Sequence, residues 1–339
     1  MTVDGALLRP DAPTPPAGGE TRTTVLVALA ANLVIAVAKA AGGAVSGSPA
    51  LLSEAAHSVA DSLNEVFLLT ALRRSRRRAD RTHPFGYGKE RFFWSLLAAV
   101  GIFVTGACFS ALQGWQALTS GHAEREAFPV VYAVLGVAFV AESVSLARAL
   151  RQLRRTARAT GRRLRDQVRD HSDPTVRTVT AEDGTAVVGV VLAAVGVVMH
   201  QLTGSAAAEG AASLAIAGLL AFVAYRLGRD TMGLLIGEAD TRLTDTAHRW
   251  LSEQPEIDTV LTVLTMQLGP DEVLLAARVD LADGLDSDGV EAVSGRIKSE
   301  LSRRLPQLTQ IFLDITDATD GDRERARRHL AALTRPAAG

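Results

Sequence analysis

A histidine and an aspartate with helical spacing lie inside a long apolar stretch of the chain. His57 and Asp61 are four residues apart within 50–72, so a helix there places both on one face, one turn apart. An imidazole beside a carboxylate can bind a divalent metal ion. Ionisable groups in apolar spans are costly and are candidates for function. We therefore predict that this pair binds metal.

Three further polar residues share the face of this helix. They are Glu54, Asn64 and Glu65. With the metal-binding pair they fall within a stripe of about 100°. For these three we favour hydrogen bonds between helices and keep a metal-binding role as the alternative.

A second acidic group lies in the stretch 175–199. Glu182 and Asp183 are adjacent, with small and apolar residues on both sides. Acids are also favoured at helix N-termini by the macrodipole, and that alternative would apply if the helix began at the pair. A helix that begins near residue 175 instead places the pair about two turns inside. We expect a metal-binding role.

Other ionisable residues in apolar stretches have several possible roles. Glu142 is predicted to belong either to a proton path or to a helix-packing hydrogen bond. Asn32 and Lys39 are expected to form hydrogen bonds or to extend toward the membrane surface. Glu209 is expected to be solvated at the end of a span. Three histidines are expected at the membrane interface: His122, His171 and His200.

The elements that must position these groups are apolar helices. A helix needs about 20 residues to span a hydrocarbon core, and six stretches suffice: 24–45, 50–72, 92–118, 128–150, 175–199 and 206–231. Basic residues cluster in the connections 73–91 and 151–169. The other three connections together contain one basic residue, Arg125. Because basic loops stay in the cytoplasm, we expect both termini there. We expect the cell membrane as the location.

Composition excludes several classes of protein. The 339 residues are 47% hydrophobic and carry a formal net charge of −1, with one cysteine, Cys108. A nucleic-acid-binding protein would carry a basic excess, and one cysteine excludes a disulfide framework and a multi-cysteine zinc site. No phosphate-binding glycine loop, nucleophile motif or haem signature is present. We expect neither an enzyme nor a bound cofactor.

The composition changes near residue 238. Residues 238–320 contain 17 acidic and 7 basic residues. Spacing and alternation predict a helix, two strands joined by a hairpin, a helix and a strand: 242–254, 257–268, 272–281, 288–304 and 309–317. This αββαβ order predicts a ferredoxin-like α+β domain with helices on one face of a small sheet.

The predicted organisation has four parts. Residues 1–22 are polar and rich in Pro, Gly and Thr, which is typical of a disordered tail. A six-helix transmembrane domain covers 23–236, and a cytoplasmic dimerisation domain covers 238–319. Residues 320–339 are charged or alanine-rich and are expected to be a frayed tail.

Three segments together carry a family resemblance: SGSPALLSEAAHSVADSLNEVFLL, RTHPFGYGKERFFW and DPTVRTVTAEDGTAVVG. They resemble the second span, the following loop and the fifth span of the cation diffusion facilitator transporters. The fifth-span segment resembles the subgroup of the ninth human zinc transporter. The resemblance covers about residues 23–317.

The resemblance implies a homodimer that exchanges a divalent metal ion, usually zinc, for protons. It implies four ligands at mid-membrane, from two histidine–aspartate pairs on spans two and five. His57, Asp61 and Asp183 match three of them, but Val179 stands where the fourth is usually histidine or aspartate. Glu182 is the nearest replacement. A set with three carboxylates tolerates Mn²⁺ or Fe²⁺ better than histidine-rich sites do.

Two further regions bear metal sites in some relatives. In the loop after span two, Asp80 and His83 match part of a second site, but Tyr87 replaces its final histidine. We favour a loop-ordering role for this group. In the cytoplasmic domain the ligand positions hold Arg278 and Asp314, so we expect no well-formed zinc cluster. The remaining histidine there, His248, is expected to be solvated.

The leading functional hypothesis is a secondary antiporter of a divalent metal ion and protons. A metal ligand must be deprotonated, so metal and protons compete for one site. The first alternative is a membrane sensor or scaffold that binds metal without transport, which the altered fifth-span pair favours. The second is an exporter of Mn²⁺, Fe²⁺ or Co²⁺ instead of Zn²⁺. A pore is a weaker third hypothesis.

Overall fold

The computed structural model describes residues 19–120, 127–159, 174–270 and 272–333. They form two compact units, Met1–Leu69 with Val104–Leu220 and Thr70–Phe103 with Ala221–Gly339. The expectations for His122 and His171 lie outside the described residues, as does most of the predicted N-terminal tail.

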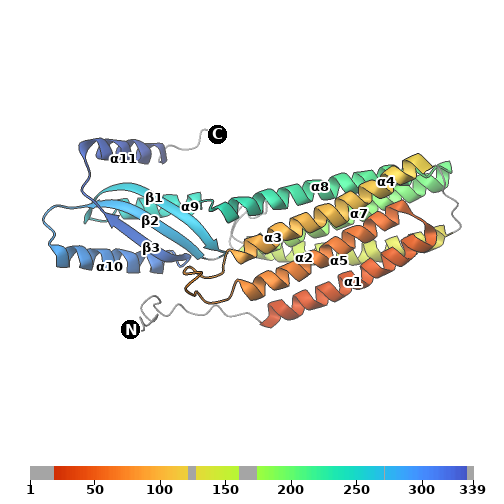
Figure 1. Ribbon diagram of the computed structural model, residues 1–339, viewed down its shortest axis with the longest axis horizontal. Coiled ribbons are helices and arrows are strands. Elements are labelled where there is room, and N and C mark those ends of the chain that lie inside the picture. Colours follow the sequence, from red (N-terminus) through yellow and green to blue (C-terminus); the bar gives the residue numbers. More distant parts are fainter. Residues whose placement is uncertain (1–18, 121–126, 160–173, 271, 334–339) are drawn as a thin grey trace. The chain divides into compact units, whose positions relative to one another are not determined.

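Helices form at all six apolar stretches and end beyond their predicted spans, although α8 begins one residue after its predicted start (Figure 1). The third is continuous but includes a π-helical segment, η2. The helices are α1 (Gly19–Ser46), α2 (Pro49–Arg74), α3 (Glu90–Gly101), η2 (Ile102–Cys108), α4 (Phe109–Ser120), α5 (Phe128–Ala159), α7 (Pro174–Thr203) and α8 (Ala207–Ile236).

Four helices in the described part of the chain are long and apolar enough to cross a membrane. They are the continuous α3–α4 helix, α5, α7 and α8. In α1 the described apolar stretch is shorter, Asn32–Ser46. The polar stripe of α2 lowers its hydropathy. The chain therefore has a helical membrane-type domain.

Helices in the first unit approach one another through small residues. A Cβ added at Gly114 of α4 would lie 2.8 Å from the Gly210 carbonyl oxygen of α8. A Cβ at Gly196 of α7 would lie 2.6 Å from Ala212 Cβ. Such close approach lets dispersion contacts and hydrogen bonds hold helices together. It explains why these spans are rich in Gly and Ala and poor in aromatic residues.

The second unit contains a three-stranded sheet in the expected element order. The elements are α9 (Thr241–Ser252), β1 (Ile257–Gly269), β2 (Glu272–Leu281), α10 (Ser287–Arg304) and β3 (Leu308–Ile315). Strand β2 is central, antiparallel to β1 and parallel to β3. Residues of α9 and α10, including Leu251 and Ile297, join the alternate β2 residues Leu275 and Val279 in one core.

The C-terminal segment expected to fray contains a helix, α11 (Asp320–Leu333). Thr319 and Asp322 form reciprocal hydrogen bonds between side chain and backbone at its start, as in a capping box. The Thr319 hydroxyl, then the Arg325 guanidinium and the Thr319 backbone N–H, donate to the Asp322 carboxylate and hold its pKa below its usual value. Arg323 then binds Asp280 of β2 at 2.9 Å and Asp258 of β1 at 3.3 Å. The cap and these two ion pairs explain why the expectation of fraying was wrong for residues 320–333.

We predict that Arg323→Ala releases α11 from the sheet. The change leaves Asp280, whose side chain is only 7% exposed, without its cation, and a buried unpaired carboxylate is unfavourable. Amide hydrogen exchange in 320–333 should become fast while the core strands stay protected. The control is Arg325→Ala, because Arg325 pairs with Asp322 inside α11 itself. Equal exchange in both variants would contradict the prediction.

Candidate functional site

The structure brings His57 and Asp61 together on α2, as their spacing predicted. His57 Nε2 lies 3.6 Å from Asp61 Oδ2. His57 is buried, 3% exposed, and neither of its ring nitrogens has a hydrogen-bond partner among the described residues. Buried polar atoms are nearly always satisfied. A buried, unsatisfied imidazole beside a carboxylate is therefore equipped to accept a proton or a metal ion.

The adjacent acids of α7 are held by two different helices. Asn64 Nδ2 of α2 donates to Glu182 Oε1 at 2.7 Å. Ser145 Oγ of α5 donates to Asp183 Oδ2 at 2.9 Å. Neighbouring residues on a helix point about 100° apart, which explains the two partners. Both acids interact electrostatically with Asp61.

The four predicted ligands do not form one closed cluster. Among the described residues, no three His, Cys, Asp or Glu side chains gather with metal-binding geometry. The structure pairs His57 with Asp61 and directs Glu182 toward α2, one turn beyond that pair. The side chain of Val179, at the altered ligand position, lies outside the described part.

The outer members of the α2 stripe connect helices, as favoured from the sequence. Asn64 binds Glu182, and Glu65 accepts a hydrogen bond from Asn32 Nδ2 of α1 at 2.9 Å. Glu54 accepts one from Lys39 of α1 at 3.0 Å. Lys39 therefore forms hydrogen bonds and does not extend to the membrane surface.

A buried polar group joins α2, α7 and α8 near their ends. Glu209 accepts a hydrogen bond from Ser48 Oγ at 2.5 Å, and its other oxygen lies 2.7 Å from His200 Nδ1. Glu209 is 0% exposed and His200 is 3% exposed. The expectation of a solvated Glu209 was wrong. His200 lies in the last turn of α7, near the end of its span, and is buried there. An acid in a first helical turn and a histidine in a last turn both complement the helix dipoles.

The loop group after α2 is closed by its own hydrogen bonds. Asp80 Oδ1 accepts from the backbone and hydroxyl of Thr82 and from the backbone of His83, while Tyr87 donates to Oδ2 at 2.6 Å. These bonds, that of Tyr87 first, hold the pKa of Asp80 well below its usual range. The Tyr87 pKa is raised by the same contact. This geometry supports the loop-ordering role favoured from the sequence.

The two positions of the αββαβ part that the family resemblance marked as ligand positions form an ion pair. Arg278 Nε of β2 donates to Asp314 Oδ2 of β3 at 2.6 Å, across the parallel register of these strands. His248 on α9 was expected to be solvated, but it is 4% exposed. It lies in the helix that packs on β1. Its ring faces Ser252, one turn further along α9.

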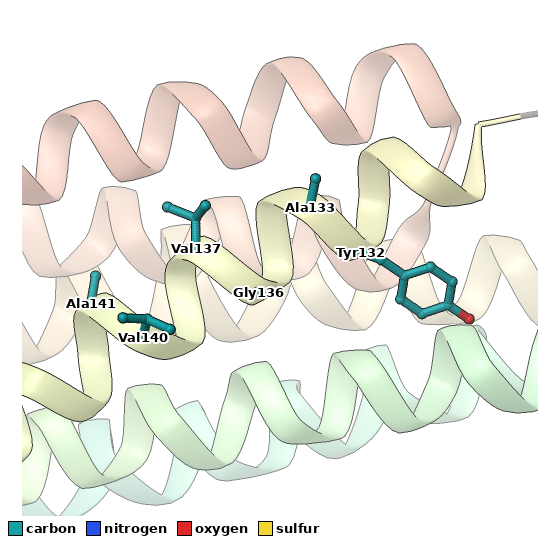
Figure 2. Close-up of a pocket in the computed structure, with 6 residues that line it drawn as sticks. All are labelled: Tyr132, Ala133, Gly136, Val137, Val140 and Ala141. Carbon is teal, nitrogen blue, oxygen red and sulfur yellow. The ribbon is translucent and has the colours of Figure 1, made fainter.

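The open depression on α5 contains no group of the candidate site. Figure 2 shows its six lining residues on this one helix. They are Tyr132, Ala133, Gly136, Val137, Val140 and Ala141. Only Tyr132 carries a polar side-chain atom, and its hydroxyl donates to Gln201 at 2.5 Å. An apolar face of this kind offers no ligand for a cation.

Sequence reasoning missed the group of Ser48, His200 and Glu209. One signal was present: a histidine and a glutamate flank a short connection, 204–206, between two apolar helices. Such a connection brings the end of one helix beside the start of the next. What the sequence could not show is that Ser48, far away in the chain, completes the group.

We predict that Glu209→Ala lowers the free energy of unfolding by about 3–5 kcal/mol, the usual cost of removing one partner from a buried pair. Thermal melting in detergent should detect the change. Glu291→Ala, at an exposed position of α10, is the control and should melt as the unchanged protein does. A Glu209→Ala variant as stable as this control would show that the buried group contributes no stability.

Comparisons with known proteins identify the family to which the helical part of the chain is similar. The family model for the cation efflux transmembrane domain matches residues 25–236. The chain is 34% identical over 237 residues to metal tolerance protein C4 of Arabidopsis thaliana, covering 69% of this chain and 51% of that protein.

A human relative gives a similar result. The chain is 30% identical over 258 residues to the human mitochondrial proton-coupled zinc antiporter SLC30A9, covering 76% of this chain and 45% of the relative. The chain thus spans about half the length of these two relatives. The resemblance inferred from the three sequence segments is confirmed. By the match of its helical domain and by these similarities, the chain belongs to the cation efflux, or cation diffusion facilitator, family of metal transporters.

Proposed function

We propose that this protein is a secondary transporter that moves a divalent transition-metal ion, Zn²⁺ in the first instance, across a membrane in exchange for protons. The observation that carries the proposal is the buried imidazole of His57, which lies beside Asp61 and whose two ring nitrogens have no hydrogen-bond partner in the described part of the chain. The human relative is named a proton-coupled zinc antiporter, which supports both the cargo and the coupling. The protein is not proposed to be an enzyme or to hold a cofactor.

The proposed ligands are His57, Asp61, Asp183 and Glu182. In the structure the last two accept hydrogen bonds from Ser145 and Asn64. A metal ion entering beside His57 would draw both carboxylates toward it. Because ligands must be deprotonated, the ion displaces protons from these groups. A change of access between the two sides of the membrane would couple the two flows.

Several finer features belong to the same proposal. The six helical regions would all span the membrane, with both termini in the cytoplasm, and the αββαβ part would be a ferredoxin-like dimerisation domain. The open face of its sheet carries exposed apolar residues, Leu264 at 62% and Phe312 at 51%, which suits a contact with a second copy. The human relative is named mitochondrial, so the comparisons do not support the expected cell-membrane location.

A second candidate function is a membrane sensor or scaffold that binds metal without moving it. Its support is the separation of the ligands: Glu182 and Asp183 are held by different helices, and Val179 offers no donor atom.

A site with three carboxylates also favours the alternative cargoes Mn²⁺, Fe²⁺ and Co²⁺. Uptake compared among the four metals distinguishes these cargoes.

We predict that vesicles containing the purified full chain take up Zn²⁺ when an outward proton gradient drives the exchange. Asp61→Ala should abolish this uptake. The variant removes the carboxylate next to His57 and leaves the hydrogen bonds between helices intact. Membrane insertion and melting temperature are measured alongside. Zinc binding without uptake in the unchanged protein would favour the sensor, and uptake indifferent to the proton gradient would refute antiport.

We further predict that Asn64→Ala weakens metal binding by roughly 10- to 100-fold, the usual effect of removing a group that orients a ligand. Asn64 holds Glu182, whereas the matched control, Asn32, holds Glu65, which is not a proposed ligand. Calorimetric titration with Zn²⁺ should separate the two alanine variants. Equal affinities would remove Glu182 from the proposed ligand set.

A further inference from the structure

One ammonium group lies enclosed in the helices of the first unit. Lys39 on α1 has a side-chain exposure of 0%, and its Nζ lies 3.0 Å from Glu54 Oε2, 2.9 Å from Ser58 Oγ and 3.9 Å from Glu142 Oε1. These oxygen atoms come from α2 and α5. A buried charge is very costly unless it is paired and hydrogen-bonded. The three oxygens therefore form a built pocket around one positive charge.

The pocket contains an acceptor oxygen that the Lys39 ammonium does not use. Glu54 uses Oε2 for Lys39, but its buried Oε1 has no hydrogen-bond partner among the described residues. This oxygen faces Gly189 of α7, where an added Cβ would collide with it. Glycine at this position thus leaves room for a carboxylate with a free acceptor. Such an oxygen-lined pocket suits a hard cation.

The pocket adjoins the proposed metal site. Glu54 and Ser58 flank His57 on α2, and Lys39 interacts electrostatically with Asp61. Among the side chains that the structure describes here, six acids lie in this region with one lysine, Lys39: Glu54, Asp61, Glu65, Glu142, Glu182 and Asp183. Without the ammonium, the same pocket would attract a mobile cation from solution.

We propose that Lys39 acts as a tethered monovalent cation. Its ammonium occupies a pocket of Glu54, Ser58 and Glu142 that would otherwise bind free Na⁺ or K⁺, and it thereby makes metal exchange independent of these ions. Lys39 is a positioning residue in this role, because it keeps the charge beside His57 and Asp61 constant without touching the metal. The inference rests on the proposed antiport, but the pocket can be tested without transport.

The test compares the full chain with Lys39→Ala in vesicles that contain Na⁺, K⁺ or only the bulky organic cation N-methyl-D-glucamine. The unchanged protein should take up Zn²⁺ equally in all three. In the organic cation, Zn²⁺ uptake by Lys39→Ala should be about tenfold or more below that of the unchanged protein. In Na⁺ or K⁺ its uptake should recover. Lys39→Ala/Glu54→Gln, which removes both charges, should no longer respond to these ions. Lys298→Ala, on α10, is the control.

Melting temperature in the same three salts keeps the inference separate from the proposed function. If the unchanged protein shows no uptake, the antiport proposal fails, but Na⁺ or K⁺ should still raise the melting temperature of Lys39→Ala and not that of the double variant. If Lys39→Ala folds poorly in the organic cation, Na⁺ or K⁺ should likewise raise its melting temperature. A Lys39→Ala variant whose uptake and melting are indifferent to Na⁺ and K⁺ overturns the inference.

Discussion

The cost of placing charge in an apolar interior governs the arrangement of the helices. Charged and polar side chains in the first unit find partners on other helices: Lys39 with Glu54, Asn32 with Glu65, and Asn64 with Glu182. Each contact determines which faces of α1, α2 and α7 meet, because a mismatched rotation would leave a buried group unpaired. Small residues then let the backbones close around these contacts.

Against this background His57 is distinctive because both of its ring nitrogens lack a hydrogen-bond partner among the described residues. Its neighbours Glu54 and Ser58 on α2 each contact Lys39 of α1, although Glu54 Oε1 is also unsatisfied there. A group kept unsatisfied inside a well-paired bundle is available for an ion or a proton. The adjacent carboxylates of α7 are held close by neutral donors, Asn64 and Ser145. Neutral donors orient a carboxylate without cancelling its charge, and the charge remains for a cation.

The αββαβ part follows different physics. Alternating apolar residues of β2 and the apolar faces of α9 and α10 form its core, and the period of two along each strand makes this pattern visible in the sequence. The C-terminal helix α11 depends on a cap and on Arg323 reaching two strands. A charged segment with no apolar period therefore folds because of contacts that only the assembled sheet provides.

The sequence by itself determined the helices of the six apolar stretches, the αββαβ element order and the His57–Asp61 pair. Each depends on local spacing: apolar length, alternation, or four residues along one helix face. Only the tertiary structure decided the environments of Lys39, Glu209, His200 and His248. Their burial depends on partners distant in the chain, such as Ser48 for Glu209 and Glu54 for Lys39. The physical reason is that periodicity shows which face of a helix is polar but not which helix that face meets.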